Sequence, residues 1–152
     1  MAGAAGPACA IQDMMLLDTN VLSALMQTRR DPVVVTWLDA QAPESIWTTA
    51  VTVFEIRVGI ELLLPSRRRK ALEAAFDAML RDDLSGRVAA FDSAAAEEAS
   101  KLAAWRQRRG RPVDLRDTQI AGIALARRAA LATRNVRHFD GLDVNVVSPW
   151  AG

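Results

Sequence analysis

The stretch MMLLDTNVLSAL, residues 14–25, decides the fold that we predict for this chain. Residues 15–17 are apolar and predict a short buried strand, and this apolar run stops at Asp18. From Thr19 to Met26 the apolar residues recur at helical spacing, which predicts a helix directly after the strand. Ligands of open parallel sheets bind just beyond the carboxyl ends of the strands. We therefore expect the Asp18 carboxylate to point into a cleft.

Asp18 also stands where a helix cap is expected, and its position alone leaves two roles open. A carboxylate at a helix N-terminus accepts hydrogen bonds from free backbone N–H groups. Asp18 either only caps the helix or also faces the cleft, where Thr19 or Asn20 supplies a second polar oxygen.

Strands and helices alternate along the rest of the chain. Apolar runs predict four further short strands, at residues 45–48, 87–91, 131–133 and 144–147. Periodic segments with start and stop signals predict five further helices, at residues 31–38, 52–64, 66–84, 92–110 and 115–129. Strands separated by helices need crossover connections. The prediction is an α/β fold in which helices flank a central, mainly parallel sheet.

Length and composition indicate one packed domain. A chain of 152 residues with 51% apolar and 24% charged residues is globular in composition. Residues 14–152 are expected to form this domain. Residues 1–13 contain no continuous apolar stretch and no basic residue, so they fail as a signal peptide and are expected to be a disordered extension. The true start, at Met1, Met14 or Met15, stays open.

Several classes of protein are excluded by what the sequence lacks. Cys9 is the sole cysteine, so no internal disulfide and no thiolate zinc site is possible, which fits a cytoplasmic setting. No apolar run approaches the ~20 residues of a membrane span, and no membrane partner is expected. One histidine and no tyrosine exclude a two-histidine ribonuclease mechanism and a tyrosine nucleophile. His138 itself is expected to be structural rather than catalytic.

The second acidic candidate, Glu55, lies on the apolar stripe of its predicted helix. Its neighbours one turn away are Val51, Val58, Gly59 and Leu62. Burial of an unpaired carboxylate is costly, so Glu55 either faces a cleft or has a cation against it, and a structural pair with an Arg is the alternative. Gly59, which has no side chain, leaves room for a close approach to Glu55. Arg57 and Glu61 are expected to pair with each other on another face.

The third acidic candidate, Asp117, lies in the helix predicted at residues 115–129. Its neighbours on the inward side are Ile120, Ala121 and Ala124. The small alanines let this helix press against the sheet. Asp114 stands at the mouth of the same helix, where a cap is the better interpretation.

Asn135 follows the strand at 131–133 as Asp18 follows the first strand, and it is the fourth candidate. Its carbonyl oxygen can ligate a metal, but it carries no charge. Asp140 is the alternative acidic candidate to Asn135, although a turn before Gly141 is the better interpretation of Asp140.

Three converging carboxylates need a cation, because their repulsion would otherwise protonate one of them. Oxygen ligands select hard ions such as Mg²⁺ or Mn²⁺. Such an ion polarises a phosphoryl oxygen and activates water. The acids at Asp18, Glu55 and Asp117 therefore point to hydrolysis of a phosphodiester.

The segments LLDTNVLSAL, TVFEIRVGI, DTQIAGIALA and ALATRNVRHFDGL, in this order, resemble the PIN-domain family. The resemblance is to the VapC or FitB type, the toxin ribonucleases of bacterial toxin–antitoxin pairs. The closing VNVVSPW also matches, so the resemblance covers residues 14–150.

This resemblance implies a central parallel sheet and a Mg²⁺- or Mn²⁺-dependent endoribonuclease. The family's three acids fall on Asp18, Glu55 and Asp117, and a fourth position, often Asp, falls on Asn135. Asn135 departs from the family pattern because it carries no charge, and this departure favours one metal ion or a weak second site. Thr133 matches a hydroxyl that the family often places near the metal.

The resemblance also implies partners. Members of this type usually form homodimers and are silenced by a small antitoxin, whose tail covers the site and whose other end binds operator DNA. DNA would therefore be an indirect partner only, and the substrate would be single-stranded or looped RNA.

RNA contacts are expected from polar and basic residues near the acids. The catalytic set is Asp18, Glu55, Asp117 and Asn135, and the candidate substrate contacts are Asn20, Thr133, Arg134 and Arg111. The basic cluster at residues 67–70 is expected to be a solvated helix face. The cluster at residues 106–111 either lines the groove or is solvated.

The sequence leaves open whether some large apolar side chains lie in the core or at an interface. The run at residues 62–64 and the four tryptophans are either an interface for partners or part of the core.

Two alternative functions remain open at this point. A non-catalytic PIN-like binding module would have lost activity through Asn135. An aspartyl phosphotransferase would form a phospho-Asp at Asp18, but it would want an acid at position 20 and a Lys near the phosphate. This chain has Asn20 there, and neither of its two lysines follows a strand.

Overall fold

The computed structural model describes residues 14–112 and 114–151. The extension predicted at residues 1–13 lies outside the described residues. Within them, no helix is long and apolar enough to cross a membrane.

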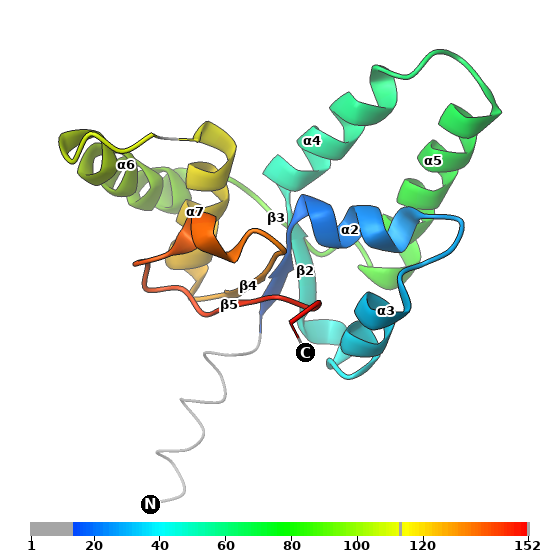
Figure 1. Cartoon of the computed structure of the whole chain (residues 1–152), viewed down its shortest axis with the longest axis horizontal. Helices are drawn as coiled ribbons and strands as arrows, with labels where there is room; N and C mark the ends of the chain where they lie inside the picture. Colours follow the sequence, from blue (N-terminus) through cyan, green and yellow to red (C-terminus); the bar gives the residue numbers. More distant parts are fainter. Residues whose placement is uncertain (1–13, 113, 152) are drawn as a thin grey trace, which may run out of the picture.

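A five-stranded parallel sheet with the order β3-β2-β1-β4-β5 forms the centre of the molecule (Figure 1). Its strands are β1 (Met15–Leu17), β2 (Ile46–Thr49), β3 (Val88–Ala89), β4 (Ala130–Ala132) and β5 (Val146–Val147). In this register Leu16 lies beside Trp47 on β2 and beside Leu131 on β4. Strand order reverses between β1 and β4, and ligands of such sheets bind at this switch point. The predicted α/β fold with a mainly parallel sheet is confirmed.

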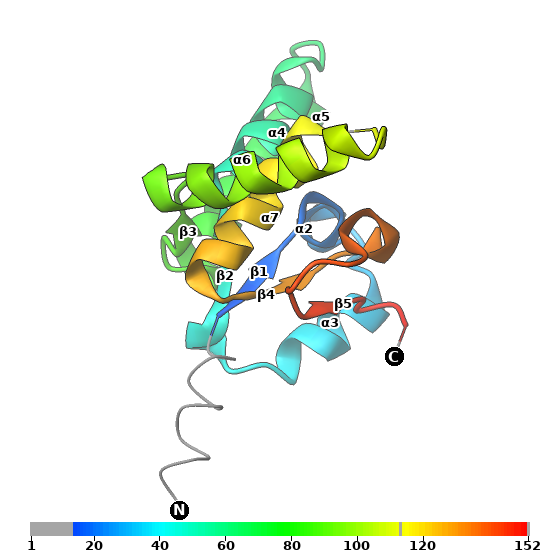
Figure 2. The ribbon, with the colours of Figure 1, turned by 90° about the vertical axis from the view of Figure 1, so that its left-hand side faces the viewer.

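In the described part of the chain, six α-helices flank the sheet in two layers. They are α2 (Thr19–Met26), α3 (Pro32–Asp39), α4 (Ala50–Glu61), α5 (Arg67–Ala78), α6 (Ser93–Arg108) and α7 (Leu115–Arg127). Figure 2 shows α6 and α7 on one side of the sheet and α3 on the other. In Figure 1, α4 and α5 form a hairpin that projects beyond the strands.

Two apolar cores follow from the alternation of side chains along β1. Leu16 and Leu17 are 0% and 2% exposed, and they point to opposite faces of the sheet. Leu16 joins the core built with α6 and α7. Leu17 joins the other core, which includes Leu22 of α2 and Phe76 of α5. Both faces of β1 are thus buried, which explains why its sequence is continuously apolar.

The packing of α6 against α7 depends on Gly122. A Cβ built at this position would lie 2.5 Å from the Ala95 backbone oxygen and 2.7 Å from the Ala99 Cβ atom. The predicted contact of α7 with the sheet is made by Ala121 and Ala124, which are each 1% exposed within the core that contains Leu16.

The main differences from the predicted boundaries lie at helix ends. Helix α4 ends at Glu61 with Leu62 as its C-cap, before the proline that was expected to stop it. Helix α5 ends at Ala78 and continues as the π-helical turn η3 (Met79–Asp83). Ser66 caps α5 as predicted, since its hydroxyl oxygen accepts a hydrogen bond from the Arg69 N–H.

Candidate functional site

Asp18 leads directly from β1 into α2 and is held by two hydrogen bonds. Its side chain is buried, with the residue 5% exposed. Oδ1 accepts from the Thr19 N–H at 2.8 Å, and Oδ2 accepts from the Thr133 hydroxyl at 2.8 Å. The cap role is therefore present, and the second bond ties the carboxylate to the end of β4. This orientation follows from β1 and β4 being neighbours in the sheet.

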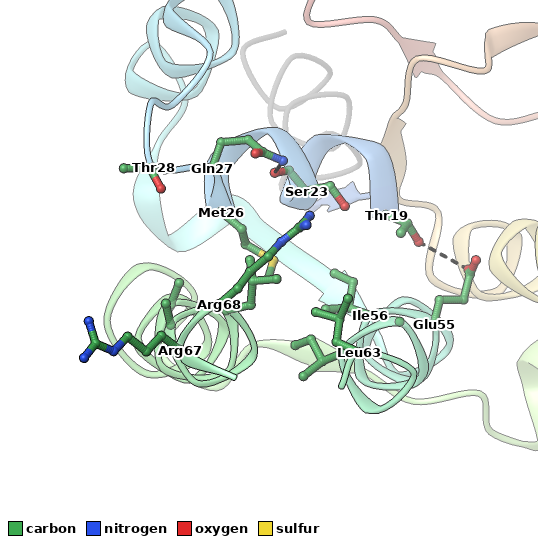
Figure 3. Close-up of a pocket in the computed structure, with 15 residues that line it drawn as sticks. Thr19, Ser23, Met26, Gln27, Thr28, Glu55, Ile56, Leu63, Arg67 and Arg68 are labelled. Carbon is green, nitrogen blue, oxygen red and sulfur yellow. Dashed lines mark hydrogen bonds between the residues drawn. The ribbon is translucent and has the colours of Figure 1, made fainter. Parts of the chain in front are cut away.

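Glu55 reaches the same edge from α4. The Thr19 hydroxyl donates to Glu55 Oε1 at 3.3 Å, as the dashed line in Figure 3 marks. Arg116 Nη1 lies 3.5 Å from Glu55 Oε2. Both interpretations of Glu55 therefore apply, because Glu55 lines a groove between α2, α4 and α5 and an Arg lies against it.

The predicted pair between Arg57 and Glu61 is wrong. Arg57 pairs with Asp77 at 2.8 Å, and Glu61 pairs with Arg69 at 2.7 Å. Both partners come from α5, which the hairpin brings alongside α4. Spacing within one helix does not reveal such neighbours.

Asp117 lies in the first turn of α7, and its backbone N–H donates to Asp114 Oδ1 at 2.9 Å. Asp114 is therefore the N-cap of this helix, as predicted. The Asp117 side chain is 19% exposed, and its Oδ2 lies 2.7 Å from Nδ1 of His138.

Electrostatic interactions show that the three acids share one region. Burial raises the pKa of Asp18, and the charge of Asp117 raises it further, against the lowering effect of the Thr133 and Thr19 hydrogen bonds. Burial also raises the pKa of Glu55, and the charges of Asp18 and Asp117 add to this effect. The Asp18 and Glu55 carboxylates are therefore harder to ionise, because both are partly buried and lie near other acids. The structure thus places the three predicted acids within electrostatic range of one another, and their role as one site stays a prediction.

The donor chemistry of this region fits a hard divalent cation. Three carboxylates offer only oxygen, which Mg²⁺ and Mn²⁺ prefer, and a cation would relieve their repulsion. Across residues 14–112 and 114–151, however, no three acidic, His or Cys side chains already stand in a metal-binding arrangement. An ion would therefore have to draw the carboxylates closer together.

The Thr133 hydroxyl is the centre of a hydrogen-bond network beside Asp18. It accepts from Asn20 Nδ2 at 3.3 Å and from the Asn135 N–H at 3.0 Å, while it donates to Asp18. Asn20 Oδ1 also accepts from the Arg134 N–H at 2.9 Å. Asn20 thus ties α2 to the loop after β4. Asn135 is exposed at the start of the 3-10 helix η4 (Val136–Phe139).

Two predicted RNA contacts have their side chains on tryptophan rings. The Arg134 guanidinium lies 4.0 Å from the Trp150 ring centroid, and that of Arg111 lies 5.6 Å from the Trp105 centroid. The indole N–H of Trp150 donates to Asp31 at 2.9 Å. A role for either arginine in substrate binding stays a prediction.

His138 makes a contact with a predicted site acid that the sequence did not indicate. It was expected to be structural, yet its ring contacts Asp117. One feature of the sequence could have indicated this contact. His138 follows β4 closely, at the same edge of the sheet where Asp18 follows β1. The partner Asp117 is 21 residues away along the chain, so spacing could not reveal the contact.

A groove of about 810 Å³ lies between α2, α4 and α5, and Glu55 is the one of the three acids that lines it. Thr19 and Glu55 line it together with Gly59, where a Cβ would meet no heavy atom within 4 Å. In Figure 3 the Arg68 side chain extends into the groove toward α2, whereas Arg67 points away. Arg67, Arg68 and Lys70 are exposed as predicted, and Arg68 also contributes to the groove. Arg69 departs from the prediction, because it is half-buried and forms ion pairs with Glu61 and Glu73.

The apolar run after α4 is not part of the core. Leu62 and Leu64 are 80% and 83% exposed, and Leu63 lines the groove. The tryptophans are half-buried and pack against the two cores, namely Trp47 and Trp105 on one and Trp37 and Trp150 on the other.

Comparison with known proteins agrees with the fold described above. A family model described as the PIN domain matches residues 15–144. Plasmid stability protein StbB of Pseudomonas syringae pv. tomato is 35% identical over 137 residues, which cover 90% of this chain and 99% of that protein. VapC ribonuclease Y4jK of Sinorhizobium fredii is 32% identical over 90% of this chain and 98% of that protein.

A solved structure is similar over the same span. A chain in the crystal structure of FitAcB from Neisseria gonorrhoeae is 31% identical, with a TM-score of 0.80, over 90% of this chain and 99% of that chain. The family match covers most of the residues in both the sheet and the flanking helices. The chain therefore belongs to the PIN-domain family, and within it to the VapC/FitB type.

Proposed function

We propose that this protein is a Mg²⁺- or Mn²⁺-dependent endoribonuclease and the toxin of a toxin–antitoxin pair. The observation that supports the proposal is that Asp18, Glu55 and Asp117, from three distant segments, lie within electrostatic range of one another, with raised pKa values for the first two. The similarity to a VapC ribonuclease supports RNA as the substrate.

Asp18, Glu55 and Asp117 would hold the ion through carboxylate oxygens. When bound, the ion supplies Lewis-acid activation of the phosphate and of the attacking water, so that water adds across a P–O bond. Thr19 and Thr133 hold both oxygens of Asp18 in a defined orientation. Asn135 brings no negative charge to the fourth position, so we propose one ion, or a second one that binds weakly.

Metal removal tests the nuclease proposal directly. We expect the purified chain to cleave single-stranded RNA in the presence of Mg²⁺ or Mn²⁺, and we expect cleavage to fall to background with excess EDTA. Adding the ion back in excess should restore cleavage, as followed by gel electrophoresis of end-labelled RNA.

Two results would count against this proposal. Cleavage that persists in EDTA would indicate a metal-independent activity or a contaminating nuclease. A chain that binds the ion but cleaves no RNA would favour the non-catalytic binding module.

We also propose that the partner is a small antitoxin whose segment lies in the groove between α2, α4 and α5. Structures of similar chains include FitAB bound to a DNA fragment, which supports an antitoxin partner and operator DNA as an indirect one. The groove suits a peptide, since Ile56 and Ile60 give it an apolar wall and Arg68 gives it a positive charge. Homodimer formation belongs to the same proposal, and light scattering after gel filtration would measure it.

Gly59→Leu is expected to weaken antitoxin binding at least about tenfold without unfolding the chain. The new side chain would occupy open groove space, because nothing lies within 4 Å of a Cβ there. Replacing Gly within a helix also gains roughly 0.8–1 kcal/mol of helix propensity. Calorimetric titration with the product of the short reading frame expected upstream of the gene measures the effect.

Gly59→Ala is the matched control, because it gains similar propensity but fills little of the groove. Equal affinity for Gly59→Leu and the wild type would place the antitoxin elsewhere on the surface.

A further inference from the structure

We propose that His138 is a positioning residue for metal binding: its Nδ1–H donates to Asp117 Oδ2 and so sets the orientation of that carboxylate toward the ion. The inference rests on the proposed nuclease function and adds a residue to it. The contact is 2.7 Å long. An ionised carboxylate can only accept, so the proton of this hydrogen bond belongs to Nδ1.

Asp117 needs such a partner more than the other two acids do. Both oxygens of Asp18 are held, by Thr19 and by Thr133. Glu55 is held by the Thr19 hydroxyl and by Arg116. The Asp117 carboxylate projects from the first turn of α7, and its bond to His138 orients it. With Oδ2 engaged, the other oxygen is free to face the ion.

The position of His138 is built into the fold. Phe139, the next residue, is 2% exposed and belongs to the core that contains Ile120 and Ile123 of α7. Arg106 of α6 donates from Nη2 to the His138 backbone oxygen at 2.8 Å. The short helix η4 is therefore fastened to the helix that carries Asp117 and to its neighbour. Such support fixes the geometry of a site to within fractions of an ångström.

A donor role for the imidazole is favoured over direct coordination. Nδ1 is already engaged by Asp117, and the His138 side chain as a whole is 53% exposed. Hard ions such as Mg²⁺ prefer oxygen ligands to imidazole. His138 thus supports the third acid in a chain that has an uncharged Asn135 at the fourth position.

Substitution of His138 with Ala, Leu or Asn tests this inference. Hydrogen-bond partners of metal ligands typically contribute 10–100-fold to metal affinity or activity. We expect His138→Ala and His138→Leu to weaken Mn²⁺ binding about 10–100-fold in calorimetry. Turnover of RNA should fall while KM changes little. His138→Asn should restore most of both, because its side-chain N–H can reach the position of Nδ1–H.

Arg137→Ala is the control on the same short helix, and it should bind Mn²⁺ like the wild type. All variants should keep the wild-type Tm, because the His138 side chain is exposed. Electron spin-echo spectroscopy of bound Mn²⁺ should show no directly coordinated imidazole nitrogen.

Two outcomes would overturn the inference while leaving the nuclease intact. They are wild-type Mn²⁺ affinity in His138→Ala, and a coordinated nitrogen signal that disappears in this variant. A wild-type chain that neither binds Mn²⁺ nor cleaves RNA would overturn the proposed function, and the role of His138 with it.

Discussion

Asp18→Asn is expected to lower metal-dependent RNA cleavage by about a hundred- to a thousandfold while the chain stays folded. Asn keeps the shape of the side chain and can still accept from the Thr19 N–H, so the start of α2 keeps its cap. The variant loses the charge that the ion needs. It also loses the acceptor for the Thr133 hydroxyl. Initial rates of RNA cleavage at saturating Mg²⁺ measure the loss.

The same variant should change how stability depends on pH. Burial raises the pKa of the Asp18 carboxyl in the folded chain above its usual value of 3.8. The stabilisation that Asp18 contributes is therefore fully present below its usual pKa, and it is lost as pH rises through the raised pKa of the folded chain. Without metal, the free energy of unfolding of the wild type should fall over this range more steeply than that of Asp18→Asn. Urea unfolding at a series of pH values measures both slopes.

Asp92→Asn provides the matched control for both experiments. Asp92 also caps a helix, since its Oδ1 accepts from the Ala95 N–H at 3.0 Å, but it lies at the start of α6. This variant should cleave RNA at the wild-type rate. Wild-type activity in Asp18→Asn would show that Asp18 is only a cap and would remove the basis of the proposed site.

Gly122→Ala is expected to destabilise the chain by about 1–3 kcal/mol, the usual cost of overpacking a core. Its Cβ would lie 2.5 Å from the Ala95 backbone oxygen and 3.0 Å from the Ala99 backbone nitrogen. Backbone atoms cannot move aside as a flexible side chain can, so α6 and α7 must separate. For a chain of this size, Tm should fall by roughly 2–12 °C in a calorimetric scan.

Gly59→Ala supplies the comparison, because both changes add one methyl group to a helix. At Gly59 the methyl meets nothing within 4 Å, so Tm should stay the same or rise. If Gly122→Ala were as stable as the wild type, the close packing of α6 on α7 would be wrong.

Local sequence was sufficient for the order of elements, and it supplied the three acids of the proposed site. The apolar run before Asp18 could only be a buried strand, and the parallel sheet follows from the alternation of strands with helices. Asp114 was correctly predicted to cap its helix because capping involves neighbours only a few residues apart. The carboxylates at Asp18, Glu55 and Asp117 were proposed as ligands because each stands beside apolar residues that predict burial.

Helix ends were less predictable for a physical reason. Pro65 forbids the continuation of a helix, but it does not require α4 to extend that far. The chain leaves α4 earlier, at Glu61, and then turns back into α5. The side-chain pairs of Arg57 and Glu61 depend on that turn, and so the prediction for them was wrong.

The sequence by itself determined a parallel α/β fold and the acidic character of its site, because both follow from patterns within single segments. Tertiary structure alone decided which side chains support those acids. His138 meets Asp117, Arg116 meets Glu55, and Arg134 lies on Trp150. These partners come from different segments, and a contact between segments depends on how they pack, which the periodicity of neither segment encodes.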